Sequence, residues 1–174
     1  MVTSARYMFV SALFLCGAAL LHSCDSTVQI EEVEDTFAVY LLRDTTLTAN
    51  DAVAKPLSAL QLADTAFILV SDLTGYRWAE HTFTVKEQLT PAMDLLKQRK
   101  NVAHGVPFVI VVGIDRIYLG TFWWTTSSSI PPACAVIDIL SGPPYAITLP
   151  QGAPEYRNDA RIRTSLMKYG VLIE

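Results

Sequence analysis

The hydrophobic positions of the chain fall into short runs separated by turn residues, a pattern typical of strands. The strongest run is Val106–Val112, which is apolar on both faces and predicts a central strand covered on both sides. Residues 113–115 then predict a tight turn, and residues 116–123 return as the hairpin partner. Weaker runs predict further strands at residues 37–42, 66–70, 76–78, 81–85, 134–139 and 145–149.

A first helix is predicted after residue 90. Thr90 can cap the free amides of a helix start, and Pro91 suits the first helical position. The basic cluster at residues 97–100 suits a helix end, where cations interact favourably with the helix dipole. The apolar side chains between these signals predict a helix that lies against the sheet.

A second helix is predicted near the end of the sequence. Asn158 is the expected capping residue, and Gly170 suits the left-handed position that follows a helix. Val171 would then pack back on Leu166 in a Schellman arrangement. Two helices and about six to seven strands predict a single α+β domain over residues 36–174, with a mostly antiparallel sheet.

The first part of the chain follows a different pattern. After Arg6, residues 8–21 run without a charge. As a helix these 14 residues would span about 21 Å, short of the roughly 30 Å hydrocarbon core of a bilayer. The length therefore favours the apolar region of a signal peptide over a permanent membrane span.

The apolar run ends on Leu21-His22-Ser23-Cys24, which resembles the lipobox of bacterial lipoprotein precursors. The resemblance implies that residues 1–23 are a signal peptide and that Cys24 carries palmitate-type acyl chains. It also implies a lipid anchor in the bacterial cell envelope, on the outer membrane or the periplasmic face. The acidic residues 24–35 would then form a solvated tether. The alternative is an ordinary secretory signal, which would give a secreted protein with a free Cys24.

The charge balance argues against a nucleic-acid partner. The chain has 13 basic and 17 acidic residues, and loss of Arg6 with the signal leaves 13 − 1 = 12 against 17, a net charge of −5. Phosphate binding needs clustered Lys and Arg, and residues 97–100 are the single basic cluster in the sequence.

The cysteines predict a domain without an internal disulfide. Of the three, Cys16 would leave with the signal and Cys24 would carry lipid, so Cys134 has no partner. Cys134 lies between two alanines in an apolar run, and we interpret it as a small buried hydrophobic residue rather than a nucleophile.

The most specialised segment is residues 122–132, in which three large aromatics precede a hydroxyl-rich loop and two prolines. Because side chains alternate faces along a strand, the aromatics cannot all enter one core, and at least one indole is expected at an edge or loop mouth. An exposed indole could stack on a sugar ring or clamp a peptide. In the alternative interpretation, the loop folds back and covers its own aromatics. The candidate contact residues are Phe122, Trp123, Trp124, Thr125, Ser127 and Ser128.

Signals for catalysis or metal binding are weak. His81 and His104 are candidate bases and residues 127–129 candidate nucleophiles, but no Gly-x-Ser-x-Gly elbow or fixed spacing ties them together. No paired His or Cys spacing predicts a metal site, and no glycine-rich loop predicts a phosphate-bearing cofactor. Residues 76–81 could line a polar cleft, although a surface strand with an Arg–Glu pair is the favoured interpretation. Carboxylate pairs for glycoside hydrolysis stay open, because sequence separation does not fix their distance.

Together these features favour a non-enzymatic module that binds an envelope protein, a peptide or a glycan through residues 122–132, without a cofactor or metal. One alternative is a proteinaceous inhibitor of an exported hydrolase, in which the same loop would enter the enzyme. A less favoured alternative is a hydrolase that uses His81 or His104.

Overall fold

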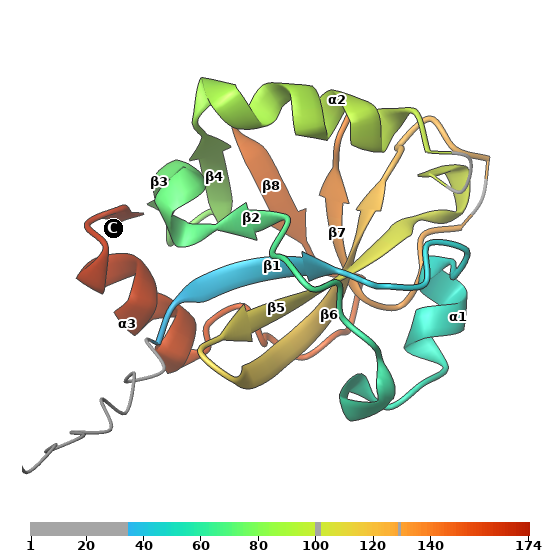
Figure 1. The fold of residues 1–174 in the computed structure, drawn as a ribbon, viewed down its shortest axis with the longest axis horizontal. Coiled ribbons are helices and arrows are strands. Elements are labelled where there is room, and N and C mark those ends of the chain that lie inside the picture. Colours follow the sequence, from blue (N-terminus) through green and yellow to red (C-terminus); the bar gives the residue numbers. More distant parts are fainter. Residues whose placement is uncertain (1–34, 100–101, 129) are drawn as a thin grey trace, which may run out of the picture. The chain divides into compact units, whose positions relative to one another are not determined.

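The computed structural model describes residues 35–99, 102–128 and 130–174, which form one α+β domain built on a curled, half-barrel sheet (Figure 1). Within these residues nine strands are hydrogen-bonded in the order β2-β1-β5-β6-β7-β8-β4-β3-β9. The strands are β1 (Phe37–Leu41), β2 (Ile68–Leu69), β3 (Leu73–Arg77), β4 (Thr82–Val85), β5 (Val106–Val112), β6 (Asp115–Trp123), β7 (Ala135–Asp138), β8 (Tyr145–Thr148) and β9 (Leu172–Ile173). The helices are α1 (Ala49–Val53), α2 (Thr90–Lys97) and α3 (Ala160–Lys168).

Strand β5 is central and covered on both faces, as its continuous apolar run predicts. It pairs antiparallel with β1 on one side and β6 on the other. Phe108 and Ile110 enter the main core, whereas Val109 and Val111 enter a smaller core shared with Ala52 of α1. All seven residues of β5 are buried, so neither face of this strand contacts water.

The sheet is mixed, and most neighbouring strands run antiparallel. Strand β7 runs parallel to β6, from which residues 124–134 separate it in the sequence. Strand β4 pairs with β8, and β3 pairs in parallel with the C-terminal strand β9. The short 3-10 turn Val70–Asp72 joins β2, which is first in the strand order, directly to β3, which is next to last.

The expected strand number of six to seven is too low. Strand β2 lies within the predicted run 66–70, whereas β9 has two residues, too few to produce a readable alternation of apolar and polar positions. Their partners, β1 and β3, supply the backbone groups that define them. The α+β class and the mostly antiparallel pairing are confirmed.

Two helices close the main core. Met93 and Leu96 of α2, with Ile162 and Leu166 of α3, are buried in the cluster that the concave side of the sheet encloses. In Figure 1, α3 lies beside the start of β1, and the two elements are in contact. Each such aliphatic side chain contributes roughly 1.5–3 kcal/mol by leaving water.

The capping residues at the starts of α2 and α3 differ from the predicted ones. Thr90 lies inside α2, whose capping position is Leu89 without a side-chain hydrogen bond. At α3 the capping residue is Asp159 rather than Asn158, since the Asp159 carboxylate accepts from the Arg161 amide.

The Schellman end of α3 is confirmed. Gly170 has a φ of +68°, the amide of Val171 donates to the Leu166 carbonyl at 3.1 Å, and the amide of Gly170 donates to the Met167 carbonyl at 3.0 Å.

The predicted signal, the tetrad that ends on Cys24 and the tether up to residue 34 lie outside the described residues. In the part of the chain that the structure describes, no helix combines the length and hydropathy needed to cross a membrane.

Candidate functional site

A groove lies on the outer face of three neighbouring strands. Phe122 of β6, Ile137 of β7 and Ile147 of β8 point into the main core. Because side chains alternate along a strand, Trp123, Val136 and Thr148 lie on the opposite face. Val136 is the direct partner of Thr148, which brings β7 and β8 side chains together on this face.

The groove has a volume of about 350 Å³ and two walls. The loop after β6 forms one wall, and the segment that follows β8 forms the other. None of the lining side chains is ionisable. The lining residues are Trp123, Thr125, Ser127, Pro131, Pro132, Val136, Thr148, Leu149 and Pro150.

Hydrogen bonds hold the loop wall in position. The Thr125 hydroxyl donates to Oδ2 of Asp138 at 2.9 Å, and the Leu140 amide donates to Oδ1 of the same carboxylate at 2.9 Å. The Ser127 hydroxyl donates to the Ala103 carbonyl at 2.8 Å, across 24 residues of sequence. The loop is therefore tied both to the end of β7 and to the turn before β5.

Trp123 is buried and does not form an open platform. Only 2% of its surface is exposed. Gly105 has a φ of +81°, and a Cβ at this position would lie 3.0 Å from Cε3 of Trp123. The backbone at Gly105 therefore packs closely against the Trp123 ring.

The structure brings together part of the predicted contact set. Trp123, Thr125 and Ser127 line the groove. Phe122 is fully buried in the main core, and Trp124 is half-buried against it. Ser128 is exposed and is not among the lining residues. Of the two indoles, Trp123 is buried, and the half-buried Trp124 lies just past the end of β6, where the loop begins.

Several lining residues were missed by reasoning from the sequence. Val136 and Thr148 come from different strands, and Leu149 and Pro150 follow the second of them. The polar–apolar alternation in 145–148 indicates that Thr148 faces away from the core, but no local pattern pairs it with Val136.

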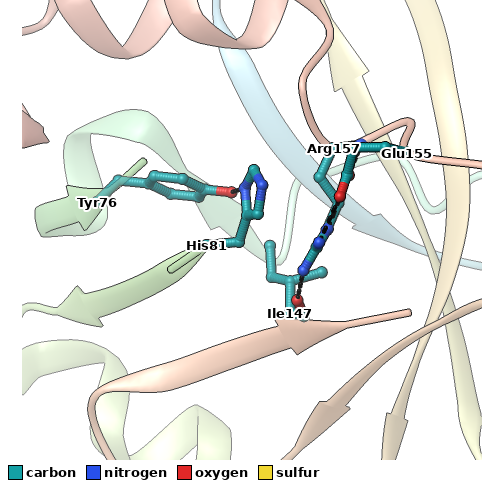
Figure 2. Close-up of polar contacts among 5 residues, drawn as sticks. All are labelled: Tyr76, His81, Ile147, Glu155 and Arg157. Carbon is teal, nitrogen blue, oxygen red and sulfur yellow. Dashed lines mark hydrogen bonds and ion pairs between the residues drawn. The ribbon is translucent and has the colours of Figure 1, made fainter. Parts of the chain in front are cut away.

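A buried polar cluster lies elsewhere in the domain, in the turn between β3 and β4 (Figure 2). His81 is 5% exposed and has a φ of +49°, a conformation that histidine tolerates better than most residues. Its Nδ1 lies 3.2 Å from the Tyr76 hydroxyl. The rings of Tyr76 and Trp78 meet the imidazole edge-on, at centroid distances of 6.3 and 5.5 Å.

Arg157 joins this cluster to β8. The Ile147 amide donates to the His81 carbonyl at 2.9 Å, and the Ile147 carbonyl accepts from the Arg157 guanidinium at 2.6 Å (Figure 2). The antiparallel register places His81 opposite Ile147, but the His81 amide donates to the Trp78 carbonyl at 3.4 Å, so the guanidinium takes the place of that amide at the Ile147 carbonyl. Glu155 orients Arg157 through a 2.9 Å bond from Nε to its carboxylate.

The electrostatics of the cluster favour a neutral imidazole. Burial lowers the pKa of His81, the nearby Arg157 charge lowers it further, and Glu155 partly opposes this. The favoured interpretation of residues 76–81 as a surface strand does not hold throughout, because β3 ends at Arg77 and both Tyr76 and His81 are buried.

Within the described residues, neither His81 nor His104 hydrogen-bonds to a serine hydroxyl. No group of three or more His, Cys, Asp or Glu side chains in that part of the chain is arranged to hold a metal ion. Cys134 is buried, and burial raises the pKa of its thiol to about 12, which disfavours the thiolate.

No protein-family model, curated protein or solved structure matches the chain.

Proposed function

We propose that the protein is a lipid-anchored lipoprotein of the bacterial cell envelope, attached through Cys24, whose folded domain is a non-enzymatic binding module. The observation that carries the proposal is the tetrad Leu21-His22-Ser23-Cys24 at the end of an uncharged run. In lipoprotein precursors, a cysteine in this position is lipidated and becomes the new N-terminus. The acidic residues 24–35 would hold the domain away from the outer membrane or the periplasmic face of the envelope.

A lipid anchor changes what the domain has to do. Each buried CH₂ contributes about 0.8 kcal/mol, and more than one acyl chain makes attachment stable. The domain then needs no membrane-binding face of its own. Its groove is available for another partner, in the class of an envelope protein, a peptide or a glycan.

The groove at Trp123 supports the binding role. Its volume of about 350 Å³ is within the range of small-molecule sites, and it combines apolar walls with a few hydroxyls. The Thr125 and Ser127 hydrogen bonds hold one wall in position, which lowers the conformational entropy that a ligand would have to remove.

Mass spectrometry of the full chain in a bacterial host tests the anchor. The membrane-fraction protein is expected to lack residues 1–23 and to carry the mass of acyl chains, whereas the Cys24→Ser variant should carry none. The Cys134→Ser variant is the matched control and should be acylated like the wild type. A wild-type mass without acyl chains would contradict the proposal and support a secreted protein.

A further inference from the structure

We propose that the groove on the outer face of β6, β7 and β8 binds a neutral glycan, an inference that rests on the proposed binding role of the domain. None of its lining side chains carries a charge. The nearest carboxylate in the loop network, Asp138, has both oxygens engaged by Thr125 and the Leu140 amide. The groove therefore lacks a charged partner for an anionic or cationic ligand.

The two threonine hydroxyls of the groove are acceptors. Each threonine hydroxyl has one proton and two lone pairs. Thr125 donates its proton to Asp138, and Thr148 donates its proton to the Val136 carbonyl at 3.2 Å. The two oxygens retain acceptor capacity and have no proton left to give. A ligand that satisfies them must supply hydrogen-bond donors, and sugar hydroxyls do so.

The rest of the lining suits the carbon faces of sugar rings. Pro131, Leu149, Pro150 and the β7 residue Val136 are among the apolar lining residues. Pyranose rings combine C–H faces with hydroxyls at their edges, so one ligand can meet the apolar walls and both threonine oxygens. Trp123 contributes a covered ring that would report on binding by its fluorescence.

Other ligand classes fit less well. An extended peptide adds to a sheet at an unpaired edge, but β6, β7 and β8 are each paired on both sides. The carbonyls of a peptide in the groove would need donors that Thr125 and Thr148 do not supply. An acyl chain would cover the oxygens of these exposed threonines without offering them a hydrogen-bond donor, which is unfavourable.

Binding to defined sugars tests the inference. The full chain is titrated with maltotriose, cellotriose, chitotriose and laminaritriose, with trigalacturonate as the charged counterpart and decanoate as the acyl probe. Tryptophan fluorescence and calorimetry are the readouts. We expect saturable binding of at least one neutral trisaccharide and none of trigalacturonate or decanoate.

Two variants locate the binding site. Val136→Phe fills the groove and should abolish sugar binding. Thr148→Val keeps the side-chain shape but removes the acceptor, and should weaken binding about fivefold to tenfold, as expected for one hydrogen bond. Thr82→Val, the same substitution on β4, is the control and should bind like the wild type. Thr148→Val also serves as the test if Val136→Phe fails to fold.

Three results would overturn the inference. The first is that none of the four neutral sugars binds. The second is preferential binding of trigalacturonate or decanoate. The third is sugar binding that Thr148→Val and Val136→Phe leave unchanged. The full-length Cys24→Ser variant should bind sugar like the wild type. Mass spectrometry therefore tests the lipid anchor, and the sugar titrations test glycan binding independently of it.

Discussion

The guanidinium of Arg157 donates to the Ile147 carbonyl at 2.6 Å, at the point where β8 extends past the start of β4. One side chain thereby satisfies a strand carbonyl and ties the segment after β8 to the sheet. Leu149 and Pro150, which lie in that segment, form one wall of the groove. The position of this wall depends on a contact made seven or eight residues further along the chain.

Loss of the Arg157 side chain is expected to destabilise the domain. Its side chain is 17% exposed, and a hydrogen bond from a charged donor contributes about 1.5–3 kcal/mol. Arg157→Ala should lower the free energy of unfolding in urea by about that amount. Arg163→Ala, which removes an exposed pair with Glu174, is the control and should cost less than about 1 kcal/mol. Equal losses in the two variants would contradict the role assigned to Arg157.

Stability should depend on pH through His81. Burial and the Arg157 charge lower the pKa of His81 in the folded state below the ordinary 6.5. The unfolded chain then takes up the proton first as the pH falls, so the stabilising contribution of the neutral imidazole is complete above pH 6.5 and is lost as the pH falls toward the lowered folded value. Urea unfolding over this range measures the effect.

The His81 variants identify the titrating group. His81→Asn keeps a residue that accepts positive φ and should flatten the pH dependence in this window. The exposed His104 is the control, and His104→Asn should leave the pH dependence intact. A slope that survives in His81→Asn would assign the effect to another group.

Gly120 is expected to tolerate no side chain. It is paired with Phe108 across β5 and β6, and a Cβ at this position would lie 2.3 Å from Cζ of that ring. Gly120→Ala should destabilise the domain by about 1–3 kcal/mol, the usual range for overpacking. Combining it with Phe108→Leu tests the cause by calorimetry, because the double variant should lose less than the sum of the single ones. If the stability losses of the two single variants simply add, the Phe108 ring is not the cause of the destabilisation.

The start of α3 gives a direct comparison of two neighbouring residues. Asp159→Ala should cost about 0.5–2 kcal/mol, because the carboxylate caps the Arg161 amide at 2.9 Å. Asn158→Ala should be close to neutral, since Asn158 is exposed and does not cap the helix. Thermal unfolding of the two variants would measure this difference. A larger loss in Asn158→Ala would reverse the assignment.

The sequence predicts those features that depend on local spacing. The apolar run in β5 indicates burial on both faces, because seven consecutive apolar residues leave no polar face. The Schellman end of α3 follows from Gly170, whose left-handed conformation carries little steric cost. The capping residues were less well predicted, since Thr90, Asn158 and Asp159 all have suitable side chains and only the path of the backbone selects among them.

The groove and the histidine cluster were decided by tertiary structure. Trp123 and its loop are conspicuous in the sequence, but Val136 and Thr148 join them only because β7 pairs with both β6 and β8. His81 likewise meets Arg157 through β8, across 76 residues of sequence. Hydrophobic spacing determines which face of an element is buried, whereas strand order determines which side chains become neighbours. The physical reason is that pairing of distant strands depends on how the whole core packs.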